Sequence, residues 1–143
     1  MAANNSTLFR IFDDLTATMK TVVQPQYIFL KNRPDTNESS DKKMSKFAVV
    51  DLPSNIEDAV IGNKKTLLNT YGVFYLFVKA RNNDTLDVND MGDFVDNVHK
   101  LFPIKGKCCT AANPTVMLRG SDGHGYQVVS ITFDLQTKWK VFD

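Results

Sequence analysis

Few side chains of this chain belong to the types that catalyse reactions or hold cofactors. The two histidines, His99 and His124, lie far apart in the sequence, and neither belongs to a nucleophile or metal motif. His99 lies where a helix is expected to end, so a cation at a helix terminus or a partly buried residue explains it best. The sequence therefore offers no paired acid and base, and we expect neither catalytic residues nor an enzyme.

The stretch "GSDGHGYQ", residues 120–127, invites comparison with the glycine-rich loops that bind phosphate. Those loops run from a strand into a helix, whose first backbone amides hold the anion. Here an alternating, strand-like segment follows instead. We therefore interpret the stretch as the tight turn of a hairpin, whose glycines adopt positive φ angles, and not as a cofactor-binding loop.

A run of acids invites a metal-binding interpretation, because carboxylate oxygens suit calcium and magnesium. The acids are Asp84, Asp87, Asp90 and Asp93. A calcium loop, however, also needs ligands at alternate positions, a central glycine and a closing glutamate, and this stretch lacks that arrangement. Helix capping and a solvated helix face explain the acids better, so we expect no metal site.

The two cysteines, Cys108 and Cys109, are adjacent. This spacing cannot close a useful disulfide loop and does not match the pairs used for zinc or redox chemistry. Reduced thiols in a strand or its approach are the expected state. No cofactor is indicated.

The bulk composition is that of an ordinary soluble domain. The 143 residues suffice for one core and not for two ordinary domains, so we expect a single domain over residues 1–143. A net charge of +1 lacks the basic excess of most nucleic-acid binders. The longest apolar run, "VFYLFV", falls short of the roughly 20 residues of a membrane helix. The amino terminus shows no secretory pattern, so we expect synthesis in the cytoplasm and no membrane contact.

Apolar periodicity divides the chain into helices and strands. The expected elements are a helix from Leu8 to Val22 ended by Pro25, strands over residues 27–31 and 46–52, a helical turn or edge strand over 56–61, a central strand over 71–80, a helix over 87–102, and strands over 114–120, 126–135 and 138–142. This order predicts an α+β domain, with a mainly antiparallel sheet, two main helices packed on one face, and a long hairpin arm.

Alternation within the strands predicts the buried faces. The strand over residues 71–80 is apolar on both faces, which is typical of the middle of a covered sheet. One face of the 126–135 strand should meet a helix, and it carries Val129, Ile131, Phe133 and Leu135.

The polar stretch over residues 32–45 is far longer than a hairpin needs. It contains nothing that could bury itself, so we expect a mobile arm. Its charges are mixed in sign and no aromatic residues lie among its cations, which favours contact with protein over nucleic acid. The predicted interface comprises the arm and the turn after residue 120, with Lys31, Arg33, Asp35, Glu38, Asp41, Lys42, Lys43, Lys46, Ser121, Asp122 and His124.

Three segments, with the order of the elements, carry a resemblance to a known family. They are "VVDLPSNIEDAV" (residues 49–60), "GVFYLFVKARNND" (residues 72–84) and "LFPI" (residues 101–104). Together with the leading helix and the polar arm, they make the chain similar to the bacteriophage tail-completion or tail-terminator proteins, some of which are called head-to-tail joining or neck proteins.

The resemblance implies a structural virion protein whose copies form a ring at the neck or tail. Its partners would be further copies of itself and portal, connector or tail-tube proteins, with nonspecific proximity to DNA in the channel. The arm would contact a neighbour, so assembly should protect it from protease between Arg33 and Lys43. The alternative is a stand-alone small-ligand-binding or regulatory domain, with a pocket lined by aromatics such as Phe74, Tyr75 and Trp139.

Overall fold

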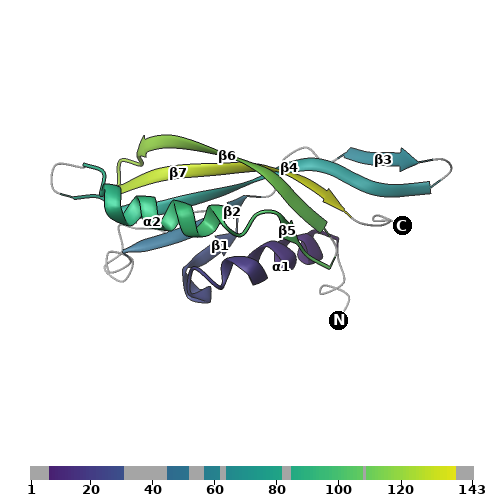
Figure 1. Cartoon of the computed structure of the whole chain (residues 1–143), viewed down its shortest axis with the longest axis horizontal. Helices are drawn as coiled ribbons and strands as arrows, with labels where there is room; N and C mark the ends of the chain where they lie inside the picture. Colours follow the sequence, from purple (N-terminus) through teal and green to yellow (C-terminus); the bar gives the residue numbers. More distant parts are fainter. Residues whose placement is uncertain are drawn as a thin grey trace.

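Two helices and a seven-stranded sheet make up the part of the chain that the computed structural model describes, which is residues 7–30, 45–51, 57–61, 64–81, 85–107 and 109–137 (Figure 1). The elements are α1 (Thr7–Met19), a 3₁₀ turn η2 (Pro25–Tyr27), β1 (Ile28–Leu30), β2 (Lys46–Asp51), β3 (Glu57–Ile61), β4 (Lys64–Lys79), α2 (Val88–His99), β5 (Ile104–Lys105), β6 (Cys109–Ser121) and β7 (Tyr126–Thr137).

The sheet has the strand order β1-β2-β4-β7-β6-β5, and β3 pairs with the first part of β4. Every pairing is antiparallel except that of β1 with β2. Helices α1 and α2 both pack on one face of the sheet (Figure 1). The predicted α+β class, the mainly antiparallel sheet and the shared helix face are therefore confirmed.

The prediction of a hairpin between the first two strands is wrong, because β1 and β2 pair in parallel, with Ile28 opposite Ala48 and Leu30 opposite Val50. Two parallel neighbours are not joined as a hairpin. The alternation of apolar and polar side chains predicts which residues face each side of the sheet. It does not predict whether neighbouring strands run parallel or antiparallel. The arm itself, apart from Ser45, lies outside the described residues.

The core on the helix side joins both helices to the four central strands. From the sheet, Phe74, Leu76 and the predicted face of β7 are buried, with Phe133 only 1% exposed. The helices contribute Leu15 and Phe94, which are fully buried. The predicted contact between the apolar face of β7 and a helix is therefore confirmed.

Both helices are shorter than the periodicity suggests. Helix α1 ends at Met19 and not at Val22, and α2 ends at His99 and not at Phe102. In both cases the second and third amides after the helix donate to carbonyls three residues back, as Val22 does to Met19 and Phe102 does to His99. This tighter turn continues the spacing of apolar residues beyond the end of the α-helix.

A second cluster of apolar side chains lies on the face opposite the helices. Phe47 stacks on Phe77 with ring centroids 4.4 Å apart, and Tyr126 meets Phe47 edge-on at 5.1 Å. All three side chains are at least nine-tenths buried. The part of β4 from Phe74 to Val78 thus packs against apolar side chains on both faces, as the sequence of the 71–80 strand predicts.

The β3–β4 hairpin extends the sheet away from the helices (Figure 1). The segment over residues 56–61, which the sequence left open between a helical turn and an edge strand, contains strand β3. Strand β4 begins at Lys64, well before the expected residue 71. Its early residues pair with β3, and this partner supplies hydrogen bonds to a segment with a weak strand pattern.

A carboxylate fastens α1 to the turn before β6. Asp14 accepts hydrogen bonds from the backbone amides of Lys107 (3.2 Å) and Cys109 (3.1 Å). Gly106 belongs to the same turn, and any side chain there would overlap Asp14. The contact joins residues far apart in the sequence and fixes where the edge of the sheet meets the first helix.

We expect Asp14→Ala to lower the free energy of unfolding by about 1–3 kcal/mol, because two backbone amides lose their acceptor. Urea unfolding followed by fluorescence measures the change. The matched control is Asp13→Ala on the same helix, where the side chain is exposed. An equal loss in the two variants would contradict the role of the Asp14 contact.

Candidate functional site

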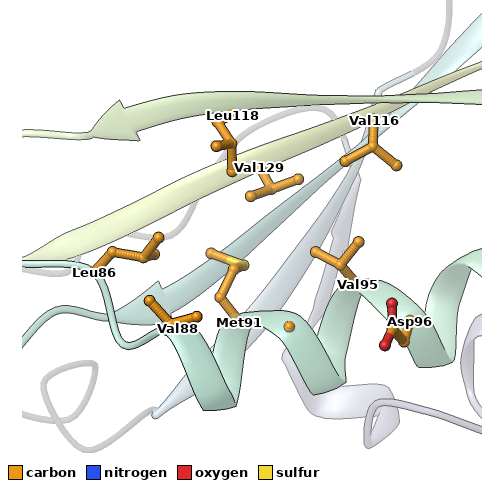
Figure 2. A pocket seen from close by; sticks show the side chains of 9 residues that line it. Leu86, Val88, Met91, Val95, Asp96, Val116, Leu118 and Val129 are labelled. Carbon is orange, nitrogen blue, oxygen red and sulfur yellow. The ribbon is translucent and has the colours of Figure 1, made fainter.

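An apolar groove lies between α2, from Val88 to Asp96, and strands β6 and β7 (Figure 2). It has a volume of about 270 Å³. The helix side is formed by Val88, Met91 and Val95, which recur at three- and four-residue steps and so share one face of α2. Asp96 lines the groove at its edge. The lining is therefore a hydrophobic surface with a charge at its rim.

The sheet side of the groove is formed by two neighbouring strands. Val116 and Leu118 are two residues apart on β6 and face the helix, as Figure 2 shows. Val129 of β7 lies opposite Leu118 in the register and forms the floor between the strands. Three branched aliphatic side chains thus face the helix across the groove.

Much of this apolar surface is open to solvent. Val88 is 68% exposed, Leu118 is 70% exposed and Val116 is 42% exposed. A single exposed aliphatic side chain is ordinary, but exposed aliphatic side chains gathered around one depression are typical of interaction sites. A Cβ atom added at Gly92, in the groove wall, would meet no atom within 4 Å. The wall of the groove is therefore open at Gly92.

The position of α2 over the sheet explains why the groove is open. Helix α2 packs most closely on β4, and β6 lies two places further along the strand order. Phe94 and Val98, which face β4 and its neighbours, are fully buried. The helix therefore covers the middle of the sheet and leaves the β6 side chains partly uncovered.

The outer edge of β6 adjoins the groove. Strand β5 pairs with β6 only at Thr110 and Ala111. Among the described residues, no strand pairs with the outer edge of β6 beyond that point. Pro114 lacks an amide hydrogen, and the register shifts on either side of residues 115–118, so this edge offers only a short length of regular strand.

The start of α2 is fixed by the predicted helix cap. Asp87 accepts a hydrogen bond from the amide of Asp90 (3.1 Å) and pairs with Arg81, whose Nε lies 3.1 Å from its carboxylate. The hydrogen bond from Arg81, followed by that from the Asp90 amide, lowers the pKa of Asp87 below its ordinary value. The charged form of Asp87 therefore stabilises the N-terminus of α2, where Val88 lies.

The glycine-rich stretch forms the predicted hairpin turn. Gly123 and Gly125 have positive φ angles of 78° and 94°. Asp122 accepts hydrogen bonds from the amides of His124 (2.7 Å) and Tyr126 (3.1 Å), and Ser121 accepts one from Gly123 (3.0 Å). These side chains orient the turn itself, while Ser121 and His124 remain exposed.

The other predicted interface residues divide into two groups. Residues 31–43 lie outside the described part of the chain. Lys46 is described, and its Nζ lies 5.2 Å from the centre of the Phe94 ring on α2. This cation–π contact covers the buried face of the helix, so the Lys46 side chain interacts within its own subunit. It does not meet the turn residues in one site.

The residues that drew attention for their chemistry stay apart. His99 and His124 are both exposed, and the buried thiol of Cys109 lies 3.6 Å from the Asp14 carboxylate. No cluster of three His, Cys, Asp or Glu side chains with metal-binding geometry occurs among the described residues. Asp84 and Cys108 lie outside them.

The aromatic trio of the alternative prediction does not come together as one pocket. Phe74 is buried in the core on the helix side, whereas Tyr75, its neighbour in β4, packs against the cluster on the other face. Trp139 lies outside the described residues. The hollow that the structure contains is instead the aliphatic groove beside α2.

The groove was not predicted. Val88 and Met91 lie three residues apart within the helix expected over residues 87–102, and Val116 and Leu118 alternate within the strand expected over residues 114–120, so the sequence contains the signal of an apolar surface. Whether those side chains are buried depends on where α2 crosses the sheet, and alternation does not encode that position.

Comparison with known proteins gives no family for this chain, because no protein-family model and no curated protein sequence matches it significantly. In the described part of the chain, neither helix has the length and apolar character needed to span a membrane.

We expect Asp87→Asn to lower stability at neutral pH, because asparagine keeps the helix cap but loses the ion pair with Arg81. A depressed pKa contributes stability above the ordinary aspartate pKa of about 3.9, and that contribution is lost as the pH falls through the folded-state pKa. The difference from the parent should therefore shrink as the pH falls below the ordinary aspartate pKa. Urea midpoints at about pH 7 and about pH 3 measure it.

The control for this prediction is Asp93→Asn, which removes one charge from an exposed position on the same helix. Its stability difference from the parent should depend less on pH. A gap between the Asp87→Asn variant and the parent that persists unchanged in acid would contradict the prediction.

Proposed function

We propose that this protein is a structural subunit of a tailed-phage virion, and that its copies form a ring at the neck or tail. The observation that carries the proposal is the exposed apolar groove beside the partly unpaired edge of β6. A surface of this kind is typical of a protein that binds another protein. The phage assignment rests on the resemblance of the segments over residues 49–60, 72–84 and 101–104.

The mode of assembly follows from the asymmetry of the subunit. The groove lies beside α2, and the β3–β4 hairpin extends from the opposite end of the long axis (Figure 1). Contacts between unlike surfaces at opposite ends repeat from copy to copy, and they close into a ring when the rotation between neighbours allows it. Further ring faces would contact portal, connector or tail-tube proteins.

A stand-alone ligand-binding domain is the second candidate, and the groove is the observation that favours it. Small-molecule sites, however, are usually clefts of about 300–1,000 Å³ with a few polar groups that orient the ligand. The groove is smaller than this range, and its lining is aliphatic apart from Asp96 at the rim. These properties fit the side chains of a protein partner better than a metabolite.

The ring proposal is tested by sedimentation velocity and negative-stain imaging of the concentrated protein, alone and mixed with portal or tail-tube proteins of the same virion. We expect closed rings of more than two copies, because each weak contact gains strength from ring closure. A chain that stays monomeric in every mixture, and that a panel of small molecules stabilises against heat, would support the ligand-binding alternative instead.

A further inference from the structure

The β3–β4 hairpin leaves the body of the domain as a two-stranded ribbon. Strand β4 pairs with β7 only from Asn69 onward, and with β2 only from Val73 onward. Residues 64–68 therefore have β3 as their strand partner, and no other described strand pairs with them. A two-stranded ribbon is marginally stable in water by itself, so it gains most from packing on another surface.

The sequence of the hairpin suits an apolar surface with an acidic rim. Its strands, "EDAVI" and "KKTLLNT", carry aliphatic residues along both chains. Lys64 and Lys65 lie next to the tip, at the start of β4, whereas Glu57 and Asp58 lie at the other end of β3, opposite Asn69 and Leu68. The tip of the hairpin is therefore basic.

Helix α2, which forms one wall of the groove, has the opposite charge. It contains Asp90, Asp93 and Asp96 and neither lysine nor arginine. All three aspartates are exposed, and Asp96 lines the groove. Two cations of the neighbouring strands are directed elsewhere, because Lys46 lies over the Phe94 ring and Arg119 donates a hydrogen bond to Ser130 on the opposite face of the sheet.

We propose that the β3–β4 hairpin of one copy docks in the groove between α2 and β6 of the next copy. The hairpin occupies the groove, and its basic tip lies beside the acidic face of α2. This inference rests on the proposed ring and names the two surfaces that join its subunits. Because the surfaces lie at opposite ends of the molecule, the contact is head-to-tail (Figure 1).

A symmetric pairing of two β6 edges is the competing contact between copies. The β6 edge is poorly suited to it, because Pro114 has no amide hydrogen, Asn113 has a positive φ of 58°, and the register shifts twice along the strand. These features restrict the regular edge to residues 115–118. The edge of β6 is therefore a poor template for pairing with a second copy of itself.

The first test replaces exposed groove residues by aspartate. We expect Val88→Asp and Leu118→Asp each to raise the concentration for half-assembly at least about tenfold, because a central apolar contact is replaced by a buried charge. The matched control is Met117→Asp, because Met117 is also exposed on β6 but lies on the opposite face, paired with Ser130. Circular dichroism and the urea midpoint confirm that each variant is folded.

The second test exchanges charges. The variant with both Lys64→Glu and Lys65→Glu should assemble more weakly by a similar factor. Adding Asp93→Lys and Asp96→Lys to this variant should restore assembly, because the hairpin is then acidic and the helix basic, and the two surfaces attract each other again. Assembly that is not restored by the second pair of substitutions overturns the proposed contact between the hairpin and α2.

The third test links the two surfaces covalently. A Lys65→Cys chain is mixed with a Gly92→Cys chain under mild oxidation, with the parent and its two native cysteines as the baseline. We expect a mixed disulfide between positions 65 and 92, identified by peptide mass spectrometry, because an added side chain at Gly92 projects into open space.

The outcomes separate this inference from the ring itself. Rings that form without a 65–92 link and tolerate Val88→Asp overturn the hairpin contact and leave the proposed function standing. A dominant link between two Leu118→Cys chains identifies the symmetric β6 pairing and also overturns it. A parent chain that never assembles, alone or with virion proteins, overturns both proposals.

Discussion

Strands β4 and β7 pair along Asn69–Lys79, and the rest of the domain is attached to this antiparallel ladder. Strand β2 extends it on one side and β6 on the other, and both helices pack across its face. The ladder is apolar on both faces over its middle, with Phe74 facing the helices and Phe77 in the aromatic cluster. A slip of one residue would exchange these two layers, so a single register determines both cores.

The sequence predicted those features that depend on local pattern. The buried face of β7, with Phe133 and Leu135, follows from alternation, and Asp87 is recognisable as a cap because it precedes an apolar helical period. The turn at Gly123 and Gly125 follows from the need for positive φ angles. In each case, the residues that determine the feature lie within a few positions of it in the sequence.

Features that depend on distant parts of the chain were not predictable in this way. Strands β1 and β2 pair in parallel, and the alternation of side chains is the same for parallel and antiparallel pairs. The early start of β4 depends on β3 as a partner, and the Asp14 contact depends on a turn that lies far along the chain. The exposure of Val88 and Leu118 depends likewise on where α2 crosses the sheet.

Strand β4 is continuous from the hairpin into the centre of the core, so a load on the hairpin has a defined route. Tension along the strand axis would act on all the hydrogen bonds between β4 and β7 at the same time, and no single pair could open before the others. Tension across the strand would instead separate them one after another. The hairpin would therefore resist a load along the strand axis far better than a load that peels it sideways.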